Sequence, residues 1–179
     1  DLPTGPHLAT ALFAHCFTCS KDIPAARRIA ARLAAMGIAV LRFDFTGLGP
    51  SEGEFQNTSF SSNVDDLIAA ATWSAQQGMP PSMLDGIKAV ATLGAPYDPA
   101  HVTHHFADAL PNIARDGTAE VYLGGRPFTI GKSFIEDTGN GVLGDVLGQL
   151  NAALLVMHAP LDAVVSVDSA AQIFTAAKH

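Results

Sequence analysis

Short apolar runs that alternate with helical patterns constrain the fold of this 179-residue chain more than any other feature. Residues 9–15, 38–45, 87–93 and a run from residue 153 are rich in aliphatic side chains and have the length of buried strands. Strands that alternate with helices along a chain build a parallel sheet with helices on its faces. The sequence therefore predicts an α/β protein with a mostly parallel, doubly wound sheet.

Two helices are predicted between these strands. The first is expected to place Ile29, Leu33 and Met36 on one face and to end at Gly37. The second is expected to begin with the capping box Ser62-Asn63-Val64-Asp65, because a side chain at each end of this motif can satisfy a free N–H group of the first turn.

The alternation weakens after Pro96. The segments Glu120–Leu123 and Phe128–Ile130 flank Gly124-Gly125-Arg126, which predicts a β-hairpin. We interpret residues 96–150 as an insertion that covers the carboxyl edge of the sheet like a lid. The whole chain, residues 1–179, is then one domain.

Composition excludes several classes of function. Apolar residues make up 48% of the chain and charged residues 15%, which is typical of a globular protein. The net charge of −7 disfavours nucleic acid and anionic membrane surfaces as partners. No apolar run approaches the ~20 residues of a membrane span, and no signal peptide opens the chain, so we expect a cytoplasmic protein. Two cysteines do not make a disulfide framework.

Two turns carry candidate functional groups. Asp162 lies just past the last apolar run, where open parallel sheets place their functional groups. The stretch His15-Cys16-Phe17-Thr18-Cys19-Ser20 follows the first strand and precedes a helix. Its Cys-x-x-Cys pattern also has the form of a thiol-redox site, because a helix N-terminus lowers the pKa of a thiol. The simpler interpretation, which we favour, is two small cysteines that behave as apolar side chains.

Histidines elsewhere give weaker signals. His101, His104 and His105 follow Asp98, and three imidazoles with a carboxylate could ligate zinc. Adjacent side chains diverge, however, so a solvated helix start is favoured. His158 is interpreted as a packed histidine at the end of the last strand. The sequence therefore predicts no metal and no cofactor.

Four features occur in the order that is typical of α/β-hydrolases. They are the His15–Ser20 turn, the loop Asp44–Gly53 with its spaced glycines, the strand that leads into Gly94-Ala95-Pro96, and the Asp162 turn. Together they resemble the serine-hydrolase half of bacterial proteins in which an α/β-hydrolase is fused to an OsmC-like domain. The resemblance implies that Asp162 is the acid of a Ser-His-Asp triad and that the Phe17 backbone N–H is an oxyanion donor. It also implies that His15 and Cys16 line the cleft.

The nucleophile and the base of that triad are not visible in the chain. Gly49-Pro50-Ser51-Glu52-Gly53 matches G-x-S-x-G, but it lies inside a loop and not between a strand and a helix, so Ser51 is rejected as the nucleophile. The family places a strand, an elbow and a helix where only residues 79–86 stand here. We expect a missing segment with a break near Leu84–Asp85, and a base beyond His179.

Three functions stay open at this stage. We favour a serine hydrolase that acts on a carboxylic ester or a related acyl compound, with a small acyl molecule as its partner. The alternatives are a degenerate, non-catalytic hydrolase fold that acts as a binding protein, and a Cys-x-x-Cys redox protein. Neither nucleic acid nor a membrane is expected as a partner, and a homo-oligomer or a fused OsmC-like domain is left open.

Overall fold

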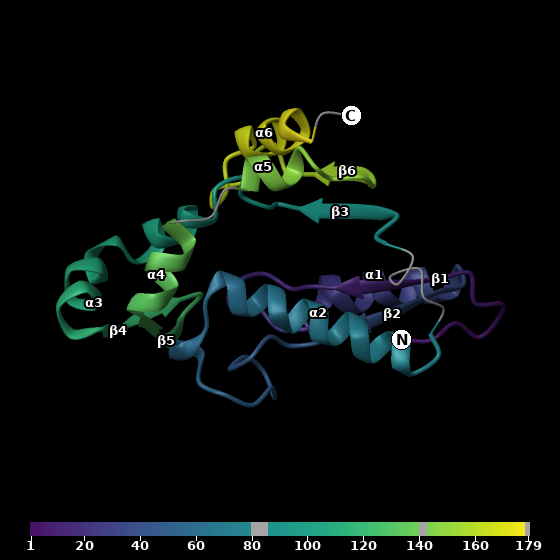
Figure 1. Cartoon of the computed structure of the whole chain (residues 1–179), viewed down its shortest axis with the longest axis horizontal. Coiled ribbons are helices and arrows are strands. Elements are labelled where there is room, and N and C mark those ends of the chain that lie inside the picture. Colours follow the sequence, from purple (N-terminus) through teal and green to yellow (C-terminus); the bar gives the residue numbers. More distant parts are fainter. Residues whose placement is uncertain (80–85, 140–142, 178–179) are drawn as a thin grey trace.

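The computed structural model describes residues 1–79, 86–139 and 143–177 (Figure 1). In chain order the elements are β1 (Ala9–Phe13), α1 (Pro24–Ala35), β2 (Ile38–Arg42), η1 (Phe55–Asn57), α2 (Phe60–Gln76), β3 (Ala89–Leu93), η2 (Pro99–Ala109), α3 (Leu110–Asp116), β4 (Thr118–Leu123), β5 (Arg126–Gly131), α4 (Lys132–Gly139), α5 (Leu143–Leu147), β6 (Ala153–Met157) and α6 (Asp168–Ala176). The predicted alternation of strands and helices is confirmed, and the predicted break near Leu84–Asp85 lies outside the described residues.

The first βαβ unit is built from β1, α1 and β2, whose strands pair in parallel with Ala9 opposite Ile38. Helix α1 packs on β2 through Ala26 and Ala30, which are both fully buried. The predicted apolar face of α1 is wrong at Met36, which is the C-cap residue and is exposed. Small alanines allow the helix to approach the sheet closely, so they form the buried face in place of the larger side chains.

Helix α2 begins at Phe60, earlier than predicted. Its capping box uses Ser59 and Ser62: the hydroxyl of Ser59 accepts the Ser62 N–H at 3.1 Å, and the hydroxyl of Ser62 accepts the Ser59 N–H at 2.8 Å. The predicted box at Ser62–Asp65 is therefore wrong. Serine stands at both ends of this box, whereas the usual capping-box pattern has an acidic or amide residue at its second end.

Asp137 of α4, which lies 76 positions after Ser61, accepts hydrogen bonds from the first turn of α2. Its two carboxylate oxygens accept the backbone N–H and the hydroxyl of Ser61, each at 2.7 Å. The hydrogen bond from the Ser61 N–H, followed by that from its hydroxyl, lowers the pKa of Asp137. An anion at a helix N-terminus is also favoured by the helix dipole. This contact fixes the inserted region to the main layer.

We expect Asp137→Asn to destabilise the protein by about 1 kcal/mol at pH 7, the usual cost of a lost helix cap. Because the pKa of Asp137 is lower in the folded state, its contribution is present above the unfolded pKa and is lost as the pH falls through the folded pKa. The loss measured by urea unfolding of Asp137→Asn against the wild type should therefore be about 1 kcal/mol at pH 7 and should shrink as the pH falls below the ordinary pKa of a carboxyl group.

Glu136→Gln is the matched control for that experiment, because it removes a carboxylate from the same helix. Glu136 pairs with Lys132 at 3.2 Å in an exposed position, and exposed pairs contribute little. We expect a change below about 0.5 kcal/mol. Equal losses in the two variants would mean that removing any negative charge from α4 is costly and that Asp137 does not cap α2.

The last two parallel strands, β3 and β6, pair with each other, with Ala89 opposite Ala153. In the described residues the parallel strands therefore form two separate pairs, β1–β2 and β3–β6, instead of one continuous sheet. One face of β3–β6 is left open: Leu93 and Leu155 are each 56% exposed. Figure 1 shows β1, β3 and β6 pointing to the same side of the molecule, so their carboxyl ends lie toward the inserted region.

The inserted region contains the predicted hairpin. Strands β4 and β5 are antiparallel and are joined by Gly124 and Gly125, which both have positive φ, as a two-residue hairpin turn requires. A hydrophobic cluster fills the space between the hairpin and the neighbouring helices: Phe106, Ile113, Val121, Leu123, Ile130 and Phe134. The insertion thus has a core of its own on the side to which β1, β3 and β6 point (Figure 1). That residues 96–150 are an insertion and act as a lid stays a prediction.

Within the three described stretches, no helix combines the length and apolar character that crossing a membrane would require.

Candidate active site

Asp162 lies in the turn after β6, beside the turn that follows β3. Its Oδ1 accepts the backbone N–H groups of Val164, at 2.8 Å, and Val165, at 2.9 Å. Its own N–H donates to the carbonyl oxygen of Ala159 at 3.2 Å. A Cβ atom placed on Gly94 would lie 3.4 Å from Asp162 Oδ2, so the two turns are in contact. The carboxylate therefore stands at the carboxyl ends of two paired parallel strands.

Two histidines hold the backbone that binds Asp162. Nε2 of His101, in η2, donates to the carbonyl oxygen of Val164 at 2.8 Å. Nε2 of His158, at the end of β6, donates to the carbonyl oxygen of Val165 at 2.8 Å. The N–H groups of Val164 and Val165 thus donate to the carboxylate, while their carbonyl oxygens accept hydrogen bonds from the two imidazoles. His101 also connects the insertion to the Asp162 turn.

These contacts keep Asp162 ionised. The backbone N–H of Val165, followed by that of Val164, lowers the pKa of Asp162, while partial burial opposes them. The side chain is 23% exposed. Its Oδ2 accepts no hydrogen bond from the described residues and lies 3.8 Å from His158 Nε2. Asp162 therefore presents a charged oxygen that can accept a hydrogen bond from a further group.

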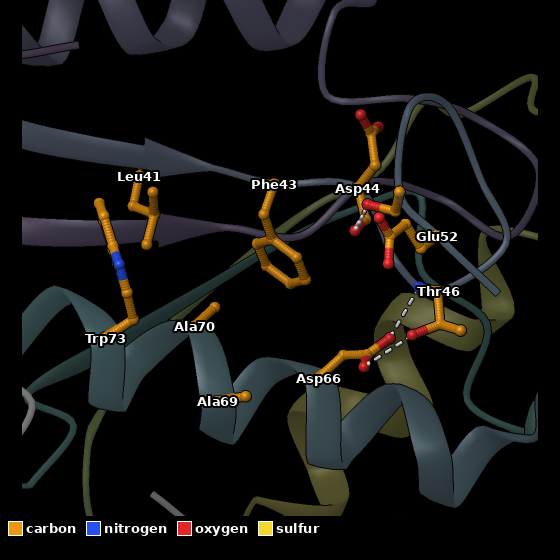
Figure 2. A pocket seen from close by; sticks show the side chains of 10 residues that line it. Leu41, Phe43, Asp44, Thr46, Glu52, Asp66, Ala69, Ala70 and Trp73 are labelled. Atoms are coloured by element: carbon orange, nitrogen blue, oxygen red, sulfur yellow. Dashed lines mark hydrogen bonds between the residues drawn. The ribbon is translucent and has the colours of Figure 1, made fainter.

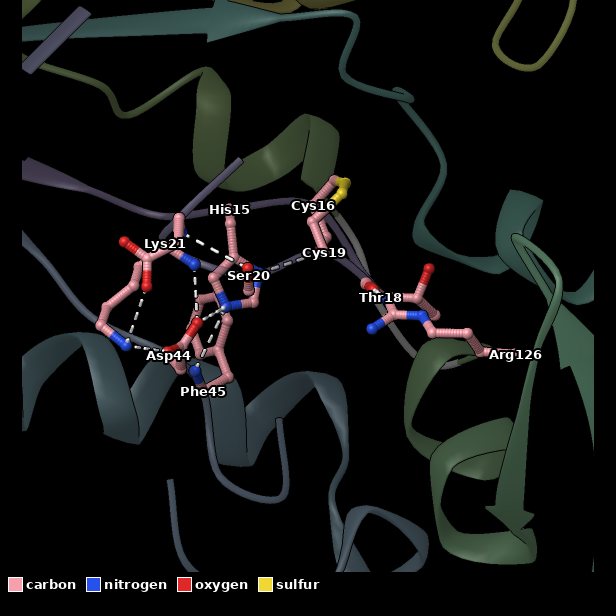
Figure 3. The surroundings of a disulfide bond; sticks show 10 residues. His15, Cys16, Thr18, Cys19, Ser20, Lys21, Asp44, Phe45 and Arg126 are labelled. Carbon is pink, nitrogen blue, oxygen red and sulfur yellow. Dashed lines mark hydrogen bonds and ion pairs between the residues drawn. A yellow bond between two sulfur atoms is a disulfide. The ribbon is translucent and has the colours of Figure 1, made fainter. Parts of the chain in front are cut away.

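A disulfide between Cys16 and Cys19 closes the turn between β1 and α1 (Figure 3). The Cys19 N–H donates to the carbonyl oxygen of Cys16 at 3.0 Å across the same turn. The guanidinium group of Arg126, from β5, donates to the carbonyl oxygen of Thr18. The favoured prediction of two unbonded, apolar-like cysteines is therefore wrong. Cys16, predicted to line the cleft, is exposed and is half of this bond.

Phe17 lies at the centre of that turn. Its ring packs against Phe55, with centroids 5.5 Å apart, and against Phe134, with centroids 4.9 Å apart. The side chain thus joins the hydrophobic cluster of the insertion. Its backbone N–H makes no hydrogen bond within the part of the chain that the structure describes. A fixed turn with an uncommitted amide is what an oxyanion donor requires, and this role stays a prediction.

His15 lies beneath the turn. Its side chain is 0% exposed and contacts the ring of Phe45 edge-on. Nε2 accepts the Phe45 N–H at 3.4 Å, and Nδ1 donates to the carbonyl oxygen of Cys16 at 2.9 Å. Since a carbonyl oxygen can only accept, Nδ1 carries a hydrogen, and Nε2 also lies 3.4 Å from Asp44 Oδ1. His15 therefore holds the turn in place, and its predicted place in the lining of the cleft stays a prediction.

Asp44 connects this turn to the loop after β2. Its buried carboxylate accepts the Lys21 backbone N–H at 2.6 Å and also binds the Lys21 ammonium group. That hydrogen bond to Asp44 raises the pKa of Lys21. A Cβ atom on Gly49 would lie 2.6 Å from Asp44 Oδ2, so the loop passes too close to the carboxylate for any side chain. Asp44 fixes the loop and the turn together.

The loop borders a hollow of about 560 Å³ against α2 (Figure 2). On one side Asp66 accepts the N–H and the hydroxyl of Thr46, at 2.8 and 3.0 Å (Figure 2). Ser51, which the G-x-S-x-G match singled out, donates its hydroxyl to the Asp44 carbonyl oxygen at 2.7 Å. The hollow is lined by none of the four predicted site residues, and its polar groups hold the loop, so we assign it no chemistry.

The histidines of η2 do not gather ligands for a metal. The ring of His101 contacts those of His104 and His105 edge-on, with centroids 5.5 and 5.7 Å apart. Among residues 1–79, 86–139 and 143–177, no group of three or more His, Cys, Asp or Glu side chains is placed to hold a metal ion.

The whole chain is similar in structure to the esterase domain of a Rhodothermus marinus protein. The TM-score is 0.71, the sequence identity is 42%, and the match covers 100% of this chain and 77% of that one. The chain belongs to the α/β-hydrolase family. The family and fold class predicted from the sequence are thereby confirmed, whereas fusion to an OsmC-like domain stays a prediction.

More distant α/β-hydrolases share the fold. Est1E from Butyrivibrio proteoclasticus, in a structure with bound ferulic acid, has a TM-score of 0.76 at 18% identity, over 100% of this chain and 80% of that one. Alpha/beta hydrolase domain-containing protein 10 from mouse has a TM-score of 0.64 at 14% identity, over 97% and 76% of the two chains. No family model matches the chain, and no curated protein matches it.

Sequence reasoning missed several residues that position this site. Arg126 and His101 lie in the insertion and act across long sequence separations, on Thr18 and on the Asp162 turn. Asp66 lies on α2 and holds the loop through Thr46. The motifs around His101 and Arg126 predict other roles, and no local motif predicts these contacts, because each partner comes from a distant part of the chain.

Proposed function

We propose that this α/β-hydrolase cleaves a carboxylic ester or a related acyl compound through a Ser-His-Asp triad. In this mechanism Asp162 orients the base histidine, and the Phe17 backbone N–H stabilises the oxyanion that forms when serine attacks the acyl carbon. A small acyl molecule is the substrate, and no cofactor is required.

The Asp162 turn is the single observation that carries the proposal. Two backbone N–H groups hold the carboxylate at Oδ1, while Oδ2, on the side of the Gly94 turn, accepts no hydrogen bond from the described residues and has His158 Nε2 3.8 Å away. A triad acid needs this arrangement, because it must remain charged and must accept a hydrogen bond from the imidazole in a fixed direction. The 42% identity to a chain described as an esterase domain supports an acyl substrate.

The serine is proposed to lie in a segment between Gly78 and Ile87 that the given sequence lacks. The separation of β1–β2 from β3–β6 supports this, because one further strand between β1 and β3 would join the pairs into a single sheet. The exposed apolar side chains Leu93 and Leu155 also favour additional covering structure. About a quarter of the Rhodothermus esterase domain has no counterpart in the match, which leaves room for such a segment.

Labelling with a fluorophosphonate probe tests the proposal on the full-length protein. We expect an intact mass above the 18.6 kDa of the given sequence, and one labelled serine in the peptide that joins Gly78 to Ile87. Ser51→Ala is the control, since its hydroxyl is committed to the Asp44 carbonyl and its loss should leave labelling unchanged. A mass of 18.6 kDa with no labelled serine would contradict the proposal and favour the non-catalytic alternative.

A further inference from the structure

We propose that Cys16 and Cys19 form a reversible thiol–disulfide site that controls how rigid the Cys16–Cys19 turn is. Through this turn the site controls the direction of the Phe17 N–H as oxyanion donor. The effect on the oxyanion donor rests on the proposed function, whereas the effect on the turn does not. Sulfur acts here as a switch on the hydrolase turn and takes no part in acyl transfer.

The disulfide is open to chemical attack from solvent. Cys16 is exposed and Cys19 is half-buried, so a thiolate reaches the Cys16 sulfur first. A dithiol reductant attacks Cys16 and forms a mixed disulfide, and Cys19 leaves as a thiolate that takes up a proton. The second thiol of the reductant then displaces Cys16 and closes its own disulfide. Two electrons pass to the protein, the protein gains two thiols, and the reductant becomes the oxidised cyclic form.

The bond closes a turn that has few other internal restraints. Within residues 16–19, as the structure describes them, one backbone hydrogen bond forms, from the Cys19 N–H to the Cys16 carbonyl oxygen. The remaining restraints come from outside: His15 binds the Cys16 carbonyl, and Arg126 binds the Thr18 carbonyl (Figure 3). Breaking the disulfide removes the only covalent link across the turn, so the backbone at Phe17 and Thr18 gains freedom.

The same turn transmits this change to the insertion. Phe17 packs against Phe134 of α4 and Phe55 of η1, and Arg126 belongs to β5. A looser turn must therefore loosen the attachment of these elements as well. An oxyanion donor works because its direction is fixed before charge develops, so disorder at Phe17 weakens it without removing it.

The test uses the full-length protein equilibrated with graded ratios of reduced and oxidised dithiothreitol. Alkylation and mass measurement count free thiols, hydrogen exchange follows the Cys19 amide, which donates to the Cys16 carbonyl oxygen across the turn, and p-nitrophenyl ester hydrolysis reports activity. We expect no thiols in the oxidised form and two in the reduced form. Reduction should speed exchange of the Cys19 amide about tenfold and slow hydrolysis about tenfold, less than the loss of a whole oxyanion donor.

The double variant Cys16→Ser/Cys19→Ser is the control, because it keeps side-chain size and cannot form the bond. It should show the exchange and hydrolysis rates of the reduced protein at every dithiothreitol ratio. Thiols that never appear, or that appear without a change in amide exchange, would overturn the switch. Redox-dependent exchange in a protein that hydrolyses no ester in either state would support the switch and overturn the proposed function instead.

Discussion

Replacing Asp162 with asparagine in the full-length protein is expected to lower ester hydrolysis about 10³- to 10⁴-fold, as does loss of the charged group that orients a triad histidine. Asparagine keeps an oxygen that can accept the Val164 and Val165 N–H groups, so the turn should retain its shape. It cannot stabilise the imidazolium that forms when the base takes the serine proton. The measurement is kcat for a p-nitrophenyl ester, with circular dichroism to verify folding.

Asp168→Asn is the matched control, because it makes the same change in the same segment. Asp168 accepts the Ser166 hydroxyl at 3.1 Å near the start of α6, and within the described residues it makes no hydrogen bond to Asp162, Val164 or Val165. We expect full activity from this variant. Full activity from a folded Asp162→Asn protein would remove Asp162 from the site.

The pH profile of wild-type hydrolysis should also show that Asp162 stays charged while the enzyme is active. Because the Val165 and Val164 N–H groups lower the pKa of Asp162, its carboxylate stays charged well below neutral pH. Loss of activity on the acid side should therefore follow the protonation of the base near the usual range of histidine, about pH 6 to 7.

The strands and the hairpin could be predicted because their signals are local. An apolar run such as residues 153–157 needs no partner to be recognised as a buried strand, and Gly124-Gly125 specifies its own turn. The apolar face of α1 could not be predicted in the same way, since Ala26 and Ala30 are selected by how closely β2 approaches. The burial of His15 likewise depends on Asp44 and Phe45, which lie in the loop after β2.

The candidate site also combines residues with local sequence signals and residues without them. The sequence predicts a functional role for Asp162 because it follows a strand, and parallel sheets place functional groups at the carboxyl ends of their strands. The disulfide was not expected, because two cysteines three positions apart are compatible with either a bond or two thiols. The sequence does not predict the partners of Arg126 and His101, since a residue that binds a distant carbonyl group leaves no pattern of that contact in its own neighbourhood.

Gly47→Ala is expected to destabilise the protein by about 3 kcal/mol or more, the range of a severe backbone clash added to a strained φ. Gly47 has φ +74, and a Cβ atom there would lie 2.4 Å from the backbone nitrogen and 2.7 Å from the Cα of Phe55. Backbone atoms cannot rotate away as a side chain can, so the loop and η1 must separate. Urea unfolding at pH 7 measures the loss.

Gly117→Ala is the control that separates the steric clash at Gly47 from the cost of a positive φ, because Gly117 has a positive φ and no clash. Gly117 has φ +85, and a Cβ atom there would meet nothing within 4 Å, so this variant should lose only the ~1 to 2 kcal/mol of a left-handed alanine. The excess loss at Gly47 then measures its contact with Phe55. Because Phe55 packs on Phe17, Gly47→Ala should also speed amide exchange at the Cys16–Cys19 turn, which Gly117→Ala should leave unchanged. Equal losses in the two variants, with no change at the turn, would mean that the loop after β2 does not support the predicted oxyanion donor.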